Sequence, residues 1–165
     1  MGADYTDQVL AEWQAVRPDF DASTAGVVNR ILRLARLLES ELDRVVARHG
    51  LSTKGDFDTL AALRRHTPEP ELSPTHLAEA ALITTGGMTG RLDRLEKSGY
   101  VERRSDPGDR RALLVRLTTL GSEVVDEVLE ASLQPQRALL EPLGTGQRTE
   151  LAQLLRLLLA RLESE

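Results

Sequence analysis

Five arginines crowd around one short turn of the sequence. The stretch ERRSDPGDRRALLVRLT, residues 102–118, holds all five around a Pro-Gly pair, although the whole chain carries a net charge of −5. Residues 84–116 contain eight Lys or Arg against five acidic residues, which leaves a net charge of −8 on the remainder. A local basic surface on an acidic protein favours contact with a polyanion through one face. Whether these arginines contact a polyanion or only face water depends on the helices and strands that carry them.

Two segments of alternating hydrophobicity flank the turn, at residues 100–104 and 112–117. Their aliphatic residues can share one face, as the buried face of a β-hairpin requires. The sequence therefore predicts a hairpin with Arg110 and Arg111 beside its tip. Arginines in that position can enter a narrow minor groove of DNA. Asp109 would repel phosphate, so we expect it to form a buttressing salt bridge with an arginine.

Two short helices are expected immediately before this hairpin. Ser73 is a good N-cap with Pro74 at the first helical position, and Thr84 or Thr85 can cap the next helix, which ends at Gly99. The second helix buries an apolar stripe of Met88, Leu92 and Leu95. A capped helix, a tight turn and a second helix with a polar outer face form a helix-turn-helix. Followed directly by a basic hairpin, it predicts a winged helix.

The outer face of that second helix begins with small residues and ends with cations. Small residues let the helix N-terminus approach bases in the major groove, and cations further along can neutralise phosphates. With the hairpin tip included, the residues expected to contact DNA are Thr84, Thr85, Gly87, Thr89, Gly90, Arg94, Lys97, Arg110 and Arg111.

The remainder of the chain is expected to be helical, which makes the protein mostly α with one small β-hairpin wing. Helices are predicted at about 6–16, 23–49 and 55–66, then from Thr118 to a kink or break at Pro135, and finally over 149–162. The last helix carries more leucine than one buried stripe requires. We therefore expect the terminal helices to pack against a second subunit, whose two-fold axis would match a palindromic DNA site.

Arg91 lies on the wrong side of the second helix for DNA. It flanks the apolar stripe, and an arginine directed towards a core needs an anionic partner because an unpaired buried charge is costly. The local candidates are Asp58 and Asp56, on the helix before the winged helix. A permanent salt bridge and a site for an anionic ligand both remain open at this point.

These motifs resemble the MarR family of winged-helix transcriptional regulators. The wing sequence DRRALLVRLT matches the family spacing of Asp-x-Arg followed by Leu-Thr, and MTGRLDRLEKSGYVERR resembles the family's recognition helix and first wing strand. The resemblance covers almost the whole chain, and it implies a single MarR-type domain over 1–165. Within it, 1–50 would supply N-terminal dimerisation and ligand-side helices, 51–117 the winged helix-turn-helix, and 118–165 the C-terminal dimerisation helices.

The N-terminal helix and the segment LSTKGDFDTL are similar to the PecS-like, urate-responsive subgroup of that family. The resemblance implies a repressor that leaves DNA when urate or a related purine or aromatic acid binds. It also implies a pocket lined by Trp13, Asp58, Arg91 and Arg103. Trp13 would stack on the ligand, and the arginines would hold a planar anion by bidentate hydrogen bonds. A phenolic or antibiotic-like acid would suit the same side chains, so the effector stays open.

Other classes of function lack support in the sequence. There is no cysteine, no nucleophile elbow, no P-loop and no dinucleotide fingerprint, and the three histidines have no triad or metal-site spacing. We therefore expect neither an enzyme nor a metal or other cofactor. No secretory signal or membrane span is predicted, so the expected location is the cytoplasm, with double-stranded DNA, a second copy and the effector as partners. A helical adaptor whose wing binds an acidic protein is the remaining alternative.

Overall fold

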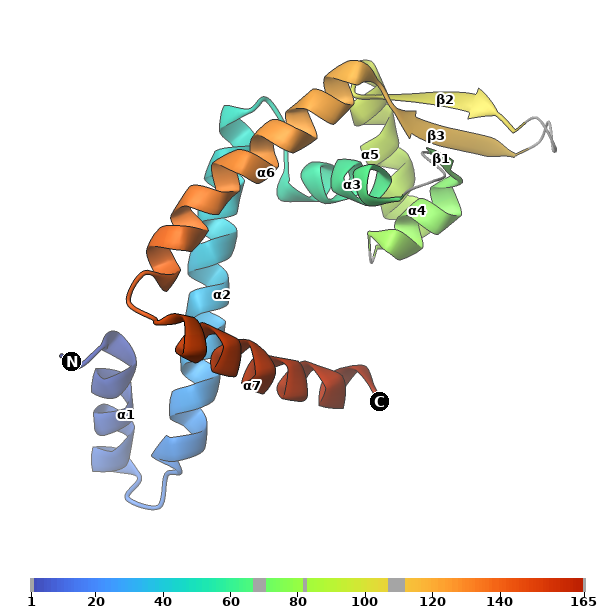
Figure 1. Cartoon of the computed structure of the whole chain (residues 1–165). Helices are drawn as coiled ribbons and strands as arrows, with labels where there is room; N and C mark the ends of the chain where they lie inside the picture. Colours follow the sequence, from blue (N-terminus) through green and yellow to red (C-terminus); the bar gives the residue numbers. More distant parts are fainter. Residues whose placement is uncertain (1, 67–70, 82, 107–111, 165) are drawn as a thin grey trace. The chain divides into compact units, whose positions relative to one another are not determined.

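Residues 2–66, 71–81, 83–106 and 112–164 are described by the computed structural model shown in Figure 1. They form two units, Met1–Lys54 and Gly55–Glu165, and each is described by itself. The wing residues Asp109, Arg110 and Arg111 lie outside the described residues. Among the helices that are described, none is long and apolar enough to cross a membrane.

The first unit consists of α1 (Tyr5–Val16) and α2 (Ala22–Arg48). A capping box of Asp4 and Asp7 begins α1, and Arg30 of α2 pairs with both carboxylates, at 2.9 Å and 2.6 Å. The first helix thus forms where it was expected and is fastened to α2 by charge as well as by the buried Leu10. These ion pairs are exposed, so each adds little to stability by itself.

Asp21 caps α2, and the helix ends where the sequence indicates. The Asp21 carboxylate accepts from the hydroxyls and backbone N–H groups of Ser23 and Thr24, which lowers its pKa to about 2. At the other end, Gly50 adopts a positive φ of 78°, a conformation that glycine reaches without the cost a Cβ imposes. Of the two caps considered, Ser23 or Asp21, the aspartate is therefore the one used.

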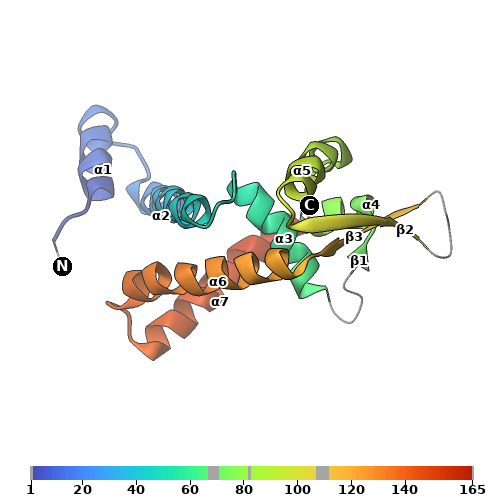
Figure 2. The ribbon, with the colours of Figure 1, turned by 90° about the horizontal axis from the view of Figure 1, so that it is seen from above.

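The second unit holds the expected winged helix, built from α3 (Lys54–Arg65), α4 (Pro74–Ala80) and α5 (Thr85–Lys97) with a small sheet. Strands β2 (Val101–Ser105) and β3 (Leu113–Leu117) form the predicted hairpin, with Val101 opposite Leu117 and Arg103 opposite Val115. A third strand, β1 (Glu71–Leu72), pairs antiparallel with β3 and was not predicted. It is only two residues long, too short for alternation to reveal it. Figure 2 shows the three strands side by side, with α4 beside them.

The core of this unit is aliphatic, with Leu60, Leu77, Met88 and Val125 at its centre. Helix α6 (Thr119–Leu140) begins within one residue of the predicted start at Thr118, and Thr118 caps it by accepting from the backbone N–H of the third helical residue at 3.0 Å. Of the predicted kink or break at Pro135, the break is wrong, because α6 continues through Pro135 to Leu140. Proline lacks a backbone N–H, so the helix loses one backbone hydrogen bond at this position. The turns before it are held by the packing of their buried side chains.

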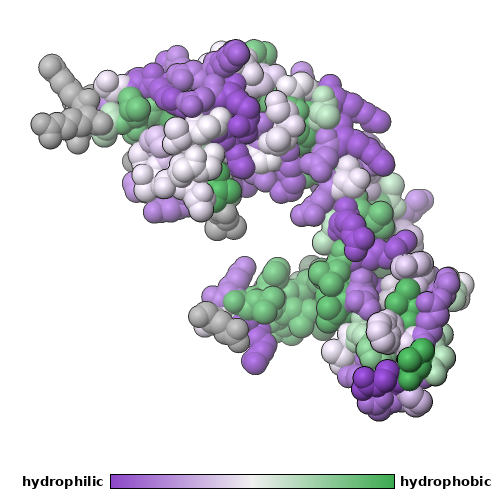
Figure 3. All heavy atoms as spheres, turned by 180° about the vertical axis from the view of Figure 1, so that it is seen from behind, coloured by the Kyte–Doolittle hydropathy of each residue, from purple (hydrophilic) through white to green (hydrophobic). Residues whose placement is uncertain are grey.

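The last helix, α7 (Thr145–Glu163), begins one turn earlier than the sequence indicates. Its leucines are exposed rather than buried, and none of its described residues belongs to the core of this chain. Figure 3 shows them as a continuous hydrophobic surface, coloured green. The exposed leucines of α7 are Leu151, Leu154, Leu155, Leu157, Leu158, Leu159 and Leu162.

Candidate nucleic-acid interface

Helix α5 presents a face of small residues to solvent. The Thr84 hydroxyl caps it by accepting from the Gly87 backbone N–H at 3.3 Å, so of the two candidate caps Thr84 is the one used. The predicted stripe of Met88, Leu92 and Leu95 is buried. On the other side, a Cβ added at Gly86 or Gly90 would meet no atom within 4 Å. The predicted DNA-facing residues that belong to α5 and its cap, Thr84, Thr85, Gly87, Thr89, Gly90, Arg94 and Lys97, are all exposed.

The helix before it completes the helix-turn-helix. Ser73 caps α4 through a hydrogen bond from the His76 backbone N–H at 3.2 Å, and Pro74 occupies the first position, as predicted. Leu77 and Ala78 are buried against the rest of the unit. A short capped helix packed in this way, followed by α5, completes the helix-turn-helix arrangement and leaves the first turns of α5 exposed.

Three of the five arginines around the wing turn are paired with carboxylates of the sheet or of α5. Arg104 of β2 donates to Glu71 of β1, and Arg116 of β3 donates to Glu102 of β2. Arg103 turns the other way and pairs with Asp93 of α5 at 2.6 Å. These three therefore brace the hairpin. The tip arginines, Arg110 and Arg111, and the expected buttress Asp109 lie beyond the described residues, and their contacts with DNA stay predictions.

Arg94 combines an exposed position with a partner inside the protein. Its side chain is 52% exposed, yet one terminal nitrogen donates to the Asp56 carboxylate at 3.0 Å and the other to the Gly90 carbonyl at 3.2 Å. Lys97, one turn further on, is exposed. A phosphate approaching Arg94 would therefore share the guanidinium with a carboxylate of α3.

Arg91 points into the protein, as the sequence suggested, and the ion pair it makes is with Asp56. Its guanidinium donates to the Gly55 carbonyl at 2.8 Å and to the Thr59 hydroxyl at 3.2 Å, and lies 3.9 Å from Asp56. Asp58 was the first candidate, but residues two positions apart lie about 200° apart around a helix. Asp56 is one turn before the buried Leu60 and so belongs to the inner face of α3. That spacing was the signal in the sequence for its role.

The expected ligand residues lie in both units. Trp13 belongs to the first unit, where its ring stacks on Phe20 with centroids 6.0 Å apart. Asp58, Arg91 and Arg103 belong to the second unit. Besides Asp93, Arg103 approaches Glu96 of α5 at 3.6 Å, and its Nε is buried without a hydrogen-bond partner among the described residues. An anion binding to Arg91 or Arg103 would have to exchange partners that fasten α5 in place.

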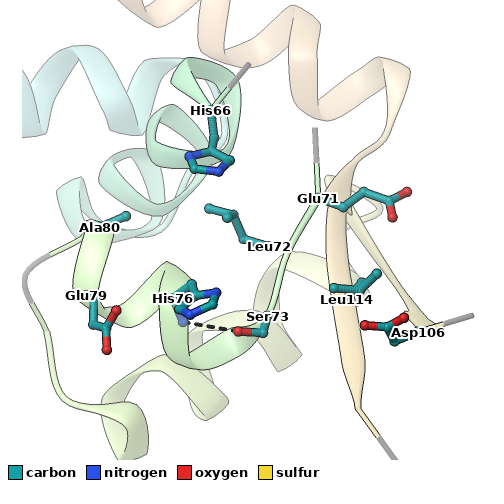
Figure 4. A pocket seen from close by; sticks show the side chains of 9 residues that line it. All are labelled: His66, Glu71, Leu72, Ser73, His76, Glu79, Ala80, Asp106 and Leu114. Carbon is teal, nitrogen blue, oxygen red and sulfur yellow. Dashed lines mark hydrogen bonds between the residues drawn. The ribbon is translucent and has the colours of Figure 1, made fainter. Parts of the chain in front are cut away.

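A cavity of about 590 Å³ lies on another side of the winged helix, between the end of α3, α4 and the sheet (Figure 4). No Lys or Arg is among its described lining residues, and three carboxylates are, which does not favour phosphate. Among the residues that the structure describes, no three His, Asp or Glu side chains are placed so that they could hold a metal ion together. The cavity is lined by His66, Glu71, Leu72, Ser73, His76, Glu79, Ala80, Asp106 and Leu114.

Comparison with known proteins gives a consistent set of relatives. The model of the MarR family matches residues 49–112, which span the helix-turn-helix and the start of the wing. The transcriptional regulator PecS of Dickeya dadantii is 34% identical over 89% of this chain and 88% of its own length. The transcriptional repressor NicR of Pseudomonas putida is 33% identical over 63% of this chain and 64% of its own length.

A solved structure extends the likeness to three dimensions. Sco3205, a MarR-family regulator from Streptomyces coelicolor whose crystal structure was determined in complex with DNA, has a TM-score of 0.72 to this chain. The two are 29% identical, and the match covers 84% of this chain and 87% of that one.

Proposed function

The chain belongs to the MarR family of transcriptional regulators, and from this we propose that it is a homodimeric repressor which urate or a related small aromatic anion releases from a palindromic operator. The family, together with a relative of the same fold in complex with DNA, supports a DNA-binding transcriptional regulator rather than an enzyme. The capped, small-residue face of α5 beside a basic hairpin is the observation that carries the DNA-binding role.

In this proposal α5 enters the major groove by its N-terminus. Thr84, Thr85 and the glycines of the first turns allow the backbone to come close to base edges, and the tip arginines Arg110 and Arg111 reach the adjacent minor groove. One such module contacts few base pairs. Two copies related by a two-fold axis would read half-sites about one helical turn apart, which is why a palindrome is expected.

The exposed leucines of α7 support the homodimer. Monomeric proteins rarely expose a large contiguous apolar surface to water, and seven leucines of α7 are exposed in the single chain. Burial of apolar surface is the main favourable contribution to association. A second copy brings an identical helix, so the two apolar surfaces can cover each other in an isologous interface.

Two arginines that anchor α5 support the effector. Arg91 holds α5 to α3, and Arg103 holds it to β2, so an anion that draws either guanidinium away changes what keeps the reading helix in place. Bidentate hydrogen bonds from arginine suit a planar anion such as urate. The ligand acts only if it binds the DNA-incompetent state more tightly than the DNA-bound state.

Fluorescence anisotropy of a labelled duplex from the gene's upstream intergenic region tests the proposal. We expect the protein to bind this duplex in preference to a random one, and urate to release it at micromolar to millimolar concentration. Xanthine, salicylate and an unrelated aliphatic acid are titrated in parallel. Release by salicylate alone would move the effector to the phenolic class, and binding that none of them disturbs would refute the effector proposal.

Arg91→Ala separates the two halves of the proposal. The variant should still bind the upstream duplex, although less selectively because Arg91 also holds α5 to α3. It should no longer be released by urate, since the side chain that links ligand to helix is gone. Loss of DNA binding together with normal urate binding, measured by calorimetry, would show that Arg91 does not belong to an effector site.

A further inference from the structure

The first turn of α3 receives two arginines from the recognition helix. Asp56 is only 2% exposed, and it lies 3.0 Å from Arg94 and 3.9 Å from Arg91. Gly55 offers its carbonyl oxygen, and Thr59 its hydroxyl, to the same Arg91 guanidinium. We call Gly55, Asp56 and Thr59 the α3 socket. It fixes α5 at two positions three residues apart: Arg91, which points into the protein, and Arg94, whose side chain is half exposed on the outer face.

Electrostatics make Asp56 the centre of this arrangement. A helix N-terminus carries a partial positive charge, so two guanidinium groups beside the first turn of α3 would be repelled without an acid there. The carboxylate in turn is buried, and a buried charge is stable only when it is paired and hydrogen-bonded. The buried carboxylate therefore needs the guanidinium groups, and they need the carboxylate. Asp56, Arg91 and Arg94 together set the position of α5.

Gly55 lets Arg91 reach the socket. A Cβ on residue 55 would lie 2.5 Å from one terminal nitrogen of the Arg91 guanidinium and 2.7 Å from its central carbon. Real Cβ atoms essentially never come so close to another heavy atom. The clash is with the end of a flexible side chain, so an alanine at this position would move the guanidinium rather than the backbone. Arg91 could then no longer donate to the Gly55 carbonyl.

Arg94 connects the socket to DNA. About half of its side chain is exposed, and it lies on the outer face that the proposed function gives to phosphate contacts. While it is paired with Asp56, part of its charge is already neutralised inside the protein. Random duplex, which is bound almost entirely through phosphates, therefore depends on this charge for a larger share of its binding than an operator that also gains base contacts.

We propose that Gly55 and Asp56 are positioning residues for DNA recognition, and that Asp56 limits binding to non-operator DNA by holding Arg94. The inference rests on the proposed placement of α5 in the major groove. Asp56 and Gly55 need not touch DNA for this role. They act through Arg91 and Arg94, which they hold in one orientation relative to α3.

Asp56→Asn tests the charge of the socket while keeping its shape, because an amide oxygen can still accept from Arg94. Freed of its carboxylate, Arg94 should neutralise one more phosphate. The slope of log affinity against log salt should then steepen by about 0.9, and affinity for random duplex at 0.1 M salt should rise roughly five- to tenfold. Affinity for the upstream duplex should rise less, because the weakened Arg94–Asp56 contact no longer holds α5 firmly to α3 and the base contacts lose part of their positioning, so the specificity ratio falls.

Gly55→Ala tests the positioning without changing any charge. The expected result is a drop of about tenfold in the specificity ratio with an unchanged salt slope, since misplaced base contacts lose discrimination but no phosphate contact is added. Gly146→Ala is the matched control. Both glycines are the second residue of their helix, and a Cβ at Gly146 would meet no atom within 4 Å.

Thermal unfolding followed by circular dichroism establishes that each variant is folded at the assay temperature. An unchanged slope and ratio in Asp56→Asn, with only a lower unfolding temperature, would reduce Asp56 to a structural residue and overturn the inference. A specificity ratio equal to that of the control in Gly55→Ala would do the same for Gly55. If the wild type itself prefers no upstream duplex, the proposed function fails, and the inference fails with it.

Discussion

Truncating two leucines of α7 should dissociate the dimer. Leu154 and Leu158 lie four residues apart on one face, with 53% and 50% of their surfaces exposed in the single chain. If α7 packs against its copy in a second subunit, Leu154→Ala combined with Leu158→Ala removes part of the apolar surface that the dimer covers. The exposed fractions set the size of the effect.

Full burial of a leucine side chain is favourable by about 1.5–3 kcal/mol, so covering the remaining half contributes about 1 kcal/mol for each side chain. A symmetric dimer contains four of these side chains, which gives a total of about 4 kcal/mol. Each 1.4 kcal/mol corresponds to a factor of about ten, so the dimer dissociation constant should rise by roughly a thousandfold.

Sedimentation velocity over a dilution series measures this constant directly. Leu113→Ala combined with Leu120→Ala is the control, since these leucines are 45% and 50% exposed but lie at the wing and at the start of α6. The control should keep the wild-type constant. An α7 double variant that stays dimeric at the same concentrations as the control would refute the assignment of this surface to the dimer.

Three further predictions concern the wing, a glycine and acid stability. Arg111→Ala should weaken binding to the upstream duplex by about tenfold or more in anisotropy and leave the sedimentation coefficient unchanged; unaltered affinity would contradict the minor-groove role. Gly121→Ala should destabilise the protein in urea by about 3 kcal/mol, because the new Cβ would clash with the Tyr100 backbone carbonyl oxygen; full stability would contradict the packing. The backbone N–H of the α1 N-cap and then the Arg30 guanidinium lower the pKa of the Asp7 carboxyl below its usual 3.8. Its contribution is therefore complete above about pH 4 and lost as the pH falls through the folded-state pKa, so an acid titration by circular dichroism should be shallower for Asp7→Asn than for the wild type.

The local rules of helix capping and hydrophobic periodicity were enough for the winged helix itself. Ser73, Pro74, Thr84 and Thr118 each occupy the cap or first-turn position that the sequence indicates, and Met88 is buried at the centre of the predicted stripe. Caps depend on a few neighbouring residues and periodicity depends on one helix, so both can be determined from sequence. Strand β1 could not, because two residues carry no period and pair only through a distant strand.

Charged partners were harder to predict than helices. The sequence indicated that Arg91 must find an anion near α3, and it offered two aspartates without deciding between them. It also placed Arg94 on the DNA face, where its side chain is exposed, but gave no reason to pair it with Asp56. That pairing depends on how α3 and α5 cross, a relation between segments almost forty residues apart.

The sequence by itself determined the elements, their caps, the buried stripe of α5 and the concentration of arginine around the wing. Only the tertiary structure decided which arginines are already neutralised, because an ion pair depends on distances of a few ångströms between helices and strands distant along the chain. Arg104 and Arg116 pair with acids of the sheet, and Arg91 and Arg94 with Asp56. The sequence shows where the arginines are along the chain, and the fold decides how many of their charges remain available to DNA.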